Sequence, residues 1–528
     1  MTRSTDDLPD DPGELIETIT HRYDSETPSI AKGSIQGGAE FVRSGFSATH
    51  FPLELLQNAD DEQASDILFE FDSDQNQLRV FDDGDGFDKS GAVAVCQQGQ
   101  SRKDHDKQIG FMGIGFKSLF EVCNRVEIHS NGYHFAFDLT GDDTEDESVP
   151  GFLLPEWIDS DSAPDPKFTD ETLGDDYETV IVGHISADDD DILPALQSEN
   201  LSASVFLFLN SLERARIRSD GALHRTLGGE LQAAADHPNQ DIRHATELYV
   251  DALDEHEVSG EQNAETELDA PVQVRTIRDD GDEQRYILFR NDWIPTDVPR
   301  PQFREDLTRS ELFVAFRYDD SGLCPSAGSI RLSPVHSYLP LSTFNDLDID
   351  FLLHADFDLT PTRENIQQDS PWNEAVVTQL REQVLEPVAQ VVSQHDHWRN
   401  TLEAIIPDHR GGDSLIHDQL LGRFADDLSE TPLFHPVGKD TPELIPFSDA
   451  VAVSEDVLEL FDPTTIEKAR GGWPVDSSQH AALARLESGS LDVAAVHDVL
   501  ETRPPEAIAQ NPVEWFNSVY YAIAEYAY

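Results

Sequence analysis

Apolar and polar residues recur along the chain with two periods, which together predict a mixed α/β protein. Apolar residues at helical spacing predict helices at 13–23 and 51–65 and a long amphipathic helix at 372–393. Runs rich in β-branched and aromatic residues predict strands in two groups. The first group is 66–71, 77–81, 125–130, 134–139 and 179–185, and the second is 272–277, 286–290, 312–317 and 349–357.

The pattern also divides the chain into three parts. We expect a first domain at 1–220, a second α/β domain at 221–395 and a mostly helical region at 396–528. Within them, the acidic stretch 142–176 reads as an exposed insertion and 254–269 as a linker. The chain stops at Tyr528 inside a segment of helical, aromatic pattern, which suggests a truncated protein.

Composition adds an expectation about origin. The net charge of −68 comes from 104 acidic against 36 basic residues, and Lys supplies 8 of the bases while Arg supplies 28. Evenly spread acids, few Lys and a hydrophobic fraction of 38% are typical of proteins from salt-in halophiles, so we expect a halophilic archaeon as the source. In molar salt the Debye length is about 3 Å, so the charge does not exclude a nucleic-acid partner.

The remaining bulk features exclude several classes of protein. Cys96, Cys123 and Cys324 are odd in number and widely spaced, which argues against disulfide scaffolds and zinc ribbons. No window approaches 18 apolar residues, so we expect no membrane span and a cytoplasmic protein. The 19 His form no H-E-x-x-H motif, and we expect no transition-metal site.

The first segment whose residues could take part in catalysis is 54–61, E-L-L-Q-N-A-D-D, in a predicted helix. Glu54, Asn58 and Asp61 stand at i, i+4 and i+7 and share one helix face. An amide oxygen suits Mg²⁺, and a neighbouring carboxylate can deprotonate a water molecule. In so acidic a chain, a solvated helix face is the alternative.

The second segment, 82–87, D-D-G-D-G-F, follows a predicted strand. Asp82 at the strand end can accept a hydrogen bond from an exocyclic amine, and Gly84 and Gly86 allow a base to approach the backbone. A calcium loop is the alternative, but Ser90 and Ala92 stand where an EF-hand needs a Glu.

The third segment, 110–118, G-F-M-G-I-G-F-K-S, runs into a predicted helix. Glycines before a helix expose N–H groups that bind phosphate. The segment is not a P-loop, because Phe116 separates Gly115 from Lys117 and no strand precedes it.

In this order and spacing, the three segments resemble the N-box and the two glycine motifs of the GHKL ATPases. The closest resemblance is to the heat-shock protein 90-like ATP-binding domain of the sacsin-like group, over about 15–390. It implies a Bergerat-type two-layer α/β sandwich at 1–220, ATP and Mg²⁺ as ligands, Glu54 as general base and Asn58 as Mg²⁺ ligand. It implies further nucleotide-binding residues at Asp61, Asp82, Gly84, Gly86, Phe87, Ser101, Lys103, Gly110, Gly113, Gly115, Phe116, Lys117 and Thr179, with a lid at about 88–109. At Thr179 the family has a preceding Gly, whereas this chain has Glu178.

A fourth segment, 358–366, resembles the middle-domain loop of the heat-shock chaperones, whose Arg reaches the γ-phosphate. The resemblance implies that Arg363 is catalytic. The alternative is an ion pair with a nearby acid such as Glu364.

The resemblance as a whole implies an ATPase (ATP + H2O to ADP + phosphate) whose lid closure drives a chaperone-like clamp, with an ATP-dependent homodimer as the expected assembly. The client is an unidentified protein or nucleic acid. The open alternatives are a nucleic-acid-associated or defence-type clamp of MutL or MORC type, and an ATP-gated interaction module with negligible turnover.

Overall fold

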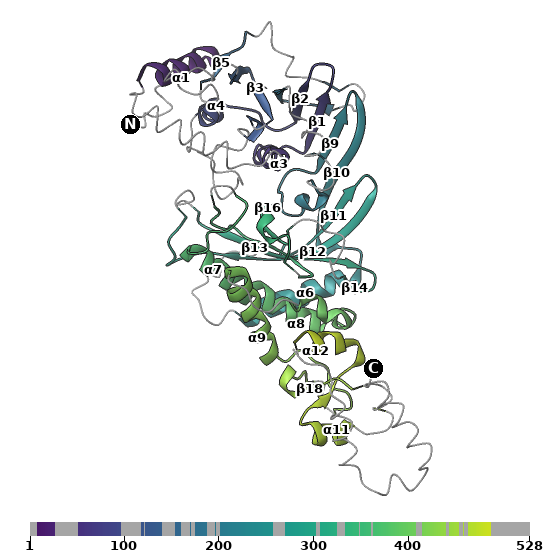
Figure 1. Cartoon of the computed structure of the whole chain (residues 1–528). Helices are drawn as coiled ribbons and strands as arrows, with labels where there is room; N and C mark the ends of the chain where they lie inside the picture. The colour runs from purple at the N-terminus through teal and green to yellow at the C-terminus, as the bar shows by residue number, and fades with distance from the viewer. Residues whose placement is uncertain are drawn as a thin grey trace, which may run out of the picture.

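The computed structural model describes most of the chain up to Leu486. The described residues are 8–26, 51–96, 118–120, 122–139, 154–159, 169–170, 175–186, 196, 201–256, 270–301, 307–324, 333–347, 349–360, 363–407, 414–439, 443–453, 458 and 463–486. Within them the protein is mixed α/β, with one large mixed sheet and helices packed against it (Figure 1).

The first half of the described chain, up to β9, forms one end of this sheet. Its helices are α1 (Pro12–Glu26), α3 (Phe51–Asp61), α4 (Lys89–Cys96) and a 3-10 helix (Ala203–Leu207). Its strands in the large sheet are β1 (Asp66–Asp72), β2 (Gln77–Asp82), β3 (Cys123–Ser130), β4 (Tyr133–Asp138), β5 (Glu156–Trp157), β8 (Thr179–Ile185) and β9 (Arg214–Ser219). β6 (Thr169–Asp170) and β7 (Asp175–Asp176) pair only with each other among the described residues.

The second half, from β10 onward, continues the sheet and adds a helical layer. Its strands are β10 (Ala222–Ala233), β11 (Val272–Asp279), β12 (Asp282–Trp293), β13 (Ser310–Asp319), β14 (Gly322–Leu323), β15 (Val335–Ser337), β16 (Leu339–Pro340) and β17 (Leu352–His354). Its helices up to Gln394 are α6 (Gln240–His256), α7 (Pro371–Leu380), a π-helical turn (Arg381–Leu385), α8 (Glu386–Gln394) and 3-10 turns at Ala234–Asp236 and Ser342–Phe344.

Beyond Gln394 the described chain is mostly short helices. They are 3-10 helices at Trp398–Ile405, Phe447–Asp449 and Ser477–Gln479, a π-helix at Leu415–Gly422, and α9 (Arg423–Glu430), α11 (Pro463–Arg470) and α12 (His480–Leu486). β18 (Ala450–Val451) and β19 (Trp473–Pro474) form a small parallel pair.

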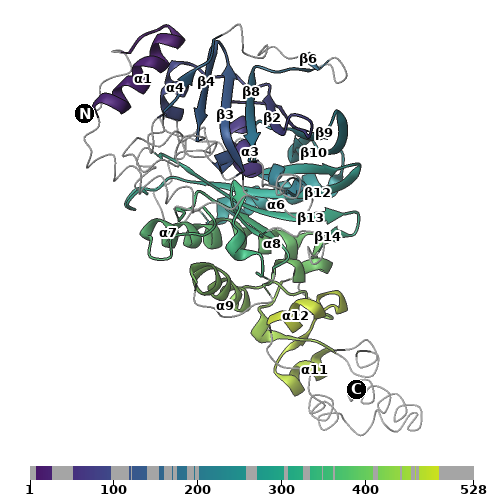
Figure 2. The ribbon, with the colours of Figure 1, turned by 45° about the horizontal axis from the view of Figure 1, so that its top comes forward.

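The sheet runs through both halves in the order β16-β15-β17-β13-β12-β11-β10-β9-β1-β2-β8-β3-β4-β5. The long strand β10 joins the halves, because residues 222–228 pair with β9 while residues 227–233 pair with β11. Two hydrophobic cores flank this strand, one made chiefly by the first half and one by the second. Figure 2 shows β4, β3, β8 and β2 side by side, with α7 and α8 beyond β13.

Several expected elements differ in length or are interrupted. The expected helix at 372–393 is broken by a π turn, because Pro387 has no N–H to give and its ring crowds the preceding turn. The expected strand 349–357 shrinks to β17, and β9, β10 and α6 were not expected at all. Part of the expected exposed insertion, Glu156–Trp157, pairs with β4 as an edge strand.

Candidate functional site

Helix α3 buries an unusual number of acidic and amide side chains. Glu54, Gln57, Asp60 and Asp61 are each at most 5% exposed, while Asn58 is half-buried. Apolar residues at Leu55, Leu56 and Ala59 join the first core and hold the helix in place. Because a buried carboxylate is costly unless it has partners, this helix is not a solvated acidic face.

The partner of Glu54 comes from the second half of the chain. Nη1 of Arg363 donates to Oε2 of Glu54 at 2.8 Å and to Oε1 of Gln57 at 3.2 Å. The side chains of Arg363 and Glu54 are 11% and 6% exposed, so this ion pair is shielded from water. Arg363 thus lies at helix α3 across a separation of 309 residues, and not merely beside Glu364.

A tight loop presents Arg363 to α3. Leu359 and Ile366 form an isolated antiparallel bridge, and Thr360 N donates to Asn365 O at 2.8 Å. Arg363 itself has a φ of 58°, a left-handed conformation that is uncommon for a residue other than glycine. Such strain persists only where the surroundings enforce it, and it often accompanies function.

Asp82 lies buried at the end of β2, 8% exposed. Burial raises the pKa of its carboxyl to about 7, a shift that the hydrogen bond from Gly84 N at 3.2 Å opposes and the charge of Asp83 reinforces. A desolvated carboxyl group whose pKa is shifted toward neutral pH is a common feature of functional sites. The arrangement suits a ligand that brings its own hydrogen-bond donor.

The loop after Asp82 depends on its two glycines. A Cβ on Gly84 would come within 2.7 Å of the Glu62 carbonyl oxygen. Gly86 has a φ of 72°, and a Cβ there would come within 2.9 Å of Ser130 Oγ. The loop is thereby pressed against both the end of α3 and the end of β3.

Sheet register brings Thr179 and Ser130 beside Asp82. Thr179 pairs with Asp82 on one side and with Ser130 on the other, so the three residues end neighbouring strands β2, β8 and β3. The two hydroxyl groups are 2.7 Å apart, and Phe87 N donates to Ser130 Oγ at 2.9 Å. By strand alternation all three side chains share the face that carries Val80 and Ile128 of the first core.

Ser130 is the site residue that sequence reasoning missed. It was expected only as the last residue of a strand, and no motif marks it. The register of β3 against β8 would have identified Ser130, but this register cannot be derived from the sequence pattern.

Other acids of these segments hold the scaffold together. Asp60 accepts hydrogen bonds from the backbone N–H groups of Asn210, Ser211 and Leu212 at 2.7–3.1 Å. Asp83 accepts from the N–H groups of Ser65 and Asp66, both at 2.8 Å. These contacts fix α3 and the Asp82 loop relative to each other and to the sheet.

Several expected nucleotide-binding residues lie outside the described residues. They are Ser101, Lys103, Gly110, Gly113, Gly115, Phe116 and Lys117. Of the expected lid, 88–96 is described and contains α4, which begins beside Asp88 and whose Lys89 donates to Leu8 O and Asp10 at 2.7 Å. Within the described ranges there is no group of three or more His, Cys, Asp or Glu arranged for a metal ion.

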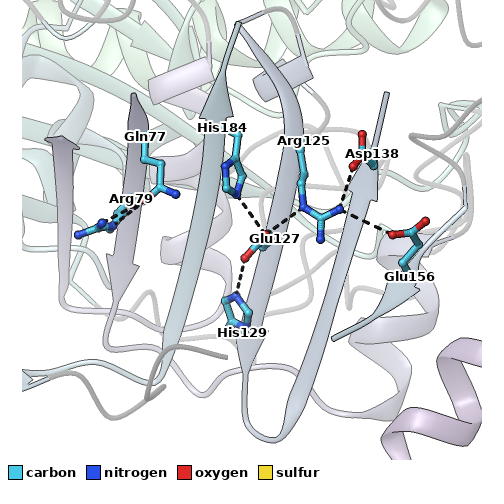
Figure 3. A network of polar contacts seen from close by, with 8 residues as sticks. All are labelled: Gln77, Arg79, Arg125, Glu127, His129, Asp138, Glu156 and His184. Atoms are coloured by element: carbon cyan, nitrogen blue, oxygen red, sulfur yellow. Dashed lines mark hydrogen bonds and ion pairs between the residues drawn. The ribbon is translucent and has the colours of Figure 1, made fainter. Parts of the chain in front are cut away.

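A second polar cluster covers the opposite face of the same strands (Figure 3). Glu127 accepts from His129 and His184 at 3.4 and 3.1 Å and from Arg125 at 3.0 Å. These hydrogen bonds hold the pKa of Glu127 well below its usual range. Because Arg125, Glu127 and His129 alternate with Val126 and Ile128, the cluster lies across the sheet from the Asp82 site.

Comparison with known proteins gives limited information. No family model matches the chain. The chain is similar to the protein NO VEIN of Arabidopsis thaliana, with 26% identity over 356 residues that cover 63% of this chain and 11% of that protein. The chain therefore spans about a tenth of the length of this relative. In the part of the chain that the structure describes, no helix is long and apolar enough to cross a lipid bilayer.

Proposed function

We propose that this chain is a Mg²⁺-dependent ATPase of the GHKL type, similar to the sacsin-like group, with a Bergerat-type fold in its first half. The observation that carries the proposal is the contact of Arg363 with Glu54 on α3. The end of that helix packs on the loop of Asp82, which is buried beside Thr179 and Ser130. In this proposal the general base and the guanidinium are in contact, and the amine acceptor precedes the loop that packs against the end of the same helix.

Each residue has a role that its environment supports. Asp82 accepts the exocyclic amine of adenine, and Thr179 and Ser130 contribute hydroxyl groups at the same end of the site. Asn58, half-buried on the face that carries Glu54 and Asp61, offers an oxygen of the kind Mg²⁺ prefers. When bound, Mg²⁺ neutralises phosphate charge.

Arg363 and Glu54 carry the chemistry. They form an ion pair with each other, so neither group can act on another partner until this pair opens. The γ-phosphate of ATP draws the guanidinium away because it carries more negative charge than a single carboxylate. Glu54 is then free to take a proton from the attacking water. Release of phosphate returns Arg363 to Glu54 and reopens the site.

The test is ATP turnover in molar KCl by the parent protein and by Glu54→Ala. We expect ATP affinity to stay within a few fold while turnover falls about 10²-fold or more, the scale of a lost general base. Glu70→Ala is the matched control, since Glu70 also pairs with an arginine, Arg218 at 3.4 Å, but from β1. Parent-like turnover in Glu54→Ala would remove the proposed role of Glu54.

For the clamp's partner we propose a protein chain. Arginines along the sheet are paired with acids, as Arg214 is with Asp66 at 2.9 Å and Arg79 with Asp72 at 3.2 Å. Arginines that are already paired with acids have less charge to offer to phosphate groups, which favours a protein partner over a nucleic acid. Turnover that rises with unfolded protein and not with duplex DNA supports this choice; the reverse would favour the nucleic-acid-associated clamp.

A further inference from the structure

Gln57 occupies a place on α3 that the proposed roles leave unexplained. Its side chain is 5% exposed, and its Oε1 accepts from Arg363 Nη1 at 3.2 Å. The same Nη1 donates to Glu54 Oε2 at 2.8 Å. Glu54 and Gln57 are three residues apart, which places both on one helix face beneath a single guanidinium nitrogen.

The two acceptors of Arg363 differ in charge. Glu54 carries charge, and the ion pair that it makes must be given up before its carboxylate can act on water. Gln57 is neutral, so it can hold one N–H of the guanidinium while the others turn to a more highly charged acceptor. Nη1 carries two N–H groups, enough to serve Gln57 and a phosphate oxygen together.

The conformation of the Arg363 loop explains why a hydrogen bond to Gln57 would matter. Arg363 reaches α3 from the other half of the chain and from a strained backbone conformation, with a φ of 58°. A guanidinium that gives up Glu54 can keep its hydrogen bond to Gln57, which holds it over α3. Correct placement before reaction is a large part of what a catalytic site supplies.

We propose that Gln57 is a positioning residue that keeps Arg363 docked on α3 while the guanidinium passes from Glu54 to the γ-phosphate of ATP. This rests on the proposed ATPase function. Gln57 acts through Arg363, so its effect is confined to ligands that carry a γ-phosphate. The ratio of the dissociation constants for ADP and ATP measures that effect.

The experiment measures Kd for Mg·ATP and Mg·ADP by calorimetry in molar KCl. Gln57→Leu removes the acceptor at similar size, and we expect the ADP/ATP ratio of Kd to fall about 3- to 10-fold, the scale of the net contribution of one hydrogen bond. Kd for ADP should stay within about twofold, which also shows that the variant folds. Gln57→Glu places a second charged acceptor beneath the guanidinium, and its ratio should also fall, because this charge competes with the γ-phosphate for Arg363.

A double variant separates positioning from structure. In an Arg363→Ala background, Gln57→Leu should lower the ratio no further, because the residue through which it acts is gone. Gln77→Leu is the matched control: Gln77 Oε1 also accepts from an arginine, Arg79 Nη2 at 3.1 Å, but at the position on β2 shown in Figure 3, and its ratio should not change.

Each of three results would overturn the role of Gln57 and leave the proposed ATPase function untouched. They are an unchanged ratio in Gln57→Leu, an equal loss of affinity for ADP and ATP, and effects that add with Arg363→Ala. ATP binding without hydrolysis in the parent would instead contradict the ATPase proposal and leave the ratio readable. Failure of the parent to bind ATP at all would overturn both.

Discussion

At the scale of single residues, Asp82 is a group whose burial costs the free protein stability. Its pKa is raised from 3.8 to about 7, so the folded state binds a proton more tightly than the unfolded state does. Stability therefore declines as pH rises from about 4 to 7, and above pH 7 the hydrogen bond from Gly84 N compensates the ionised carboxylate only in part, so a ligand that brings a donor would stabilise it further. The adenine amine is such a donor.

Asp82→Asn should separate stability from binding. We expect its melting temperature at pH 8 to equal or exceed that of the parent, because a neutral amide replaces a desolvated charge. ATP should no longer raise the melting temperature, whereas it raises that of the parent. In the parent, affinity for ADP should weaken by up to about 10-fold per pH unit below pH 7 as Asp82 takes a proton.

The neighbouring Asp83→Asn is the control for this pair of measurements. Asp83 accepts from the N–H groups of Ser65 and Asp66, so its replacement should lower the melting temperature while ATP still binds. An ATP-dependent rise in melting temperature in Asp82→Asn would contradict the adenine assignment.

At the scale of elements, α3 is tied to the second half through the segment that follows β8 in sequence. Asp60 of α3 holds the N–H groups of residues 210–212, and Arg275 of β11 donates to Phe206 O and Leu209 O at 2.9 and 2.5 Å. Phe208 between them stacks on His354 of β17, with ring centroids 4.8 Å apart. One short segment thereby links α3 to the part of the sheet that belongs to the second half.

Asp60→Ala should be strongly destabilising. It leaves the buried N–H group of Leu212 without its acceptor and removes the part-buried hydrogen bonds from Asn210 and Ser211. Because one unsatisfied buried group costs about 1–3 kcal/mol, we expect a loss of about 2–3 kcal/mol in the free energy of unfolding. Denaturant unfolding in molar KCl measures this. Asp72→Ala, at the β1–β2 turn, should cost no more than about 1 kcal/mol. Similar costs for the two variants would contradict the linking role of Asp60.

The elements that the sequence predicted are those whose pattern is local. The strands of the first half and α3 follow from period-two and helical runs, and the register of β2, β8 and β3 then places Thr179 beside Asp82. β9 was not predicted because half of its residues are arginines, and the acids of β1 that pair with Arg214 and Arg218 lie far away in sequence. β10 was not predicted because Gly228 and Gly229 interrupt its pattern.

At the scale of the whole molecule, the sequence indicates the residues of the candidate site better than the tertiary contacts that bring them together. Glu54, Asp82 and Arg363 were found by resemblance, and the structure brings Arg363 to Glu54. Gln57 and Ser130 were missed as site residues because their roles depend on tertiary contacts. The use of a single strand, β10, to carry the sheet from one half into the other has no local signature in the sequence.

The central claim is that residues from both halves of the chain form one catalytic site for ATP. The most direct measurement is steady-state ATP turnover, with ATP affinity determined alongside, for the parent, Arg363→Ala and Arg363→Lys in molar KCl. Arg309→Ala is the control, because Arg309 is an exposed arginine of the second half paired with Asp292 at 3.1 Å.

We predict that Arg363→Ala lowers turnover by at least 10-fold, toward the about 10³-fold loss seen when a transition-state guanidinium is removed, while affinity changes less. Arg363→Lys should recover part of the rate, since Lys keeps the charge but not the planar fork. Arg309→Ala should behave as the parent. Parent-like turnover in Arg363→Ala would reduce the contact with Glu54 to a structural ion pair and contradict the two-part site.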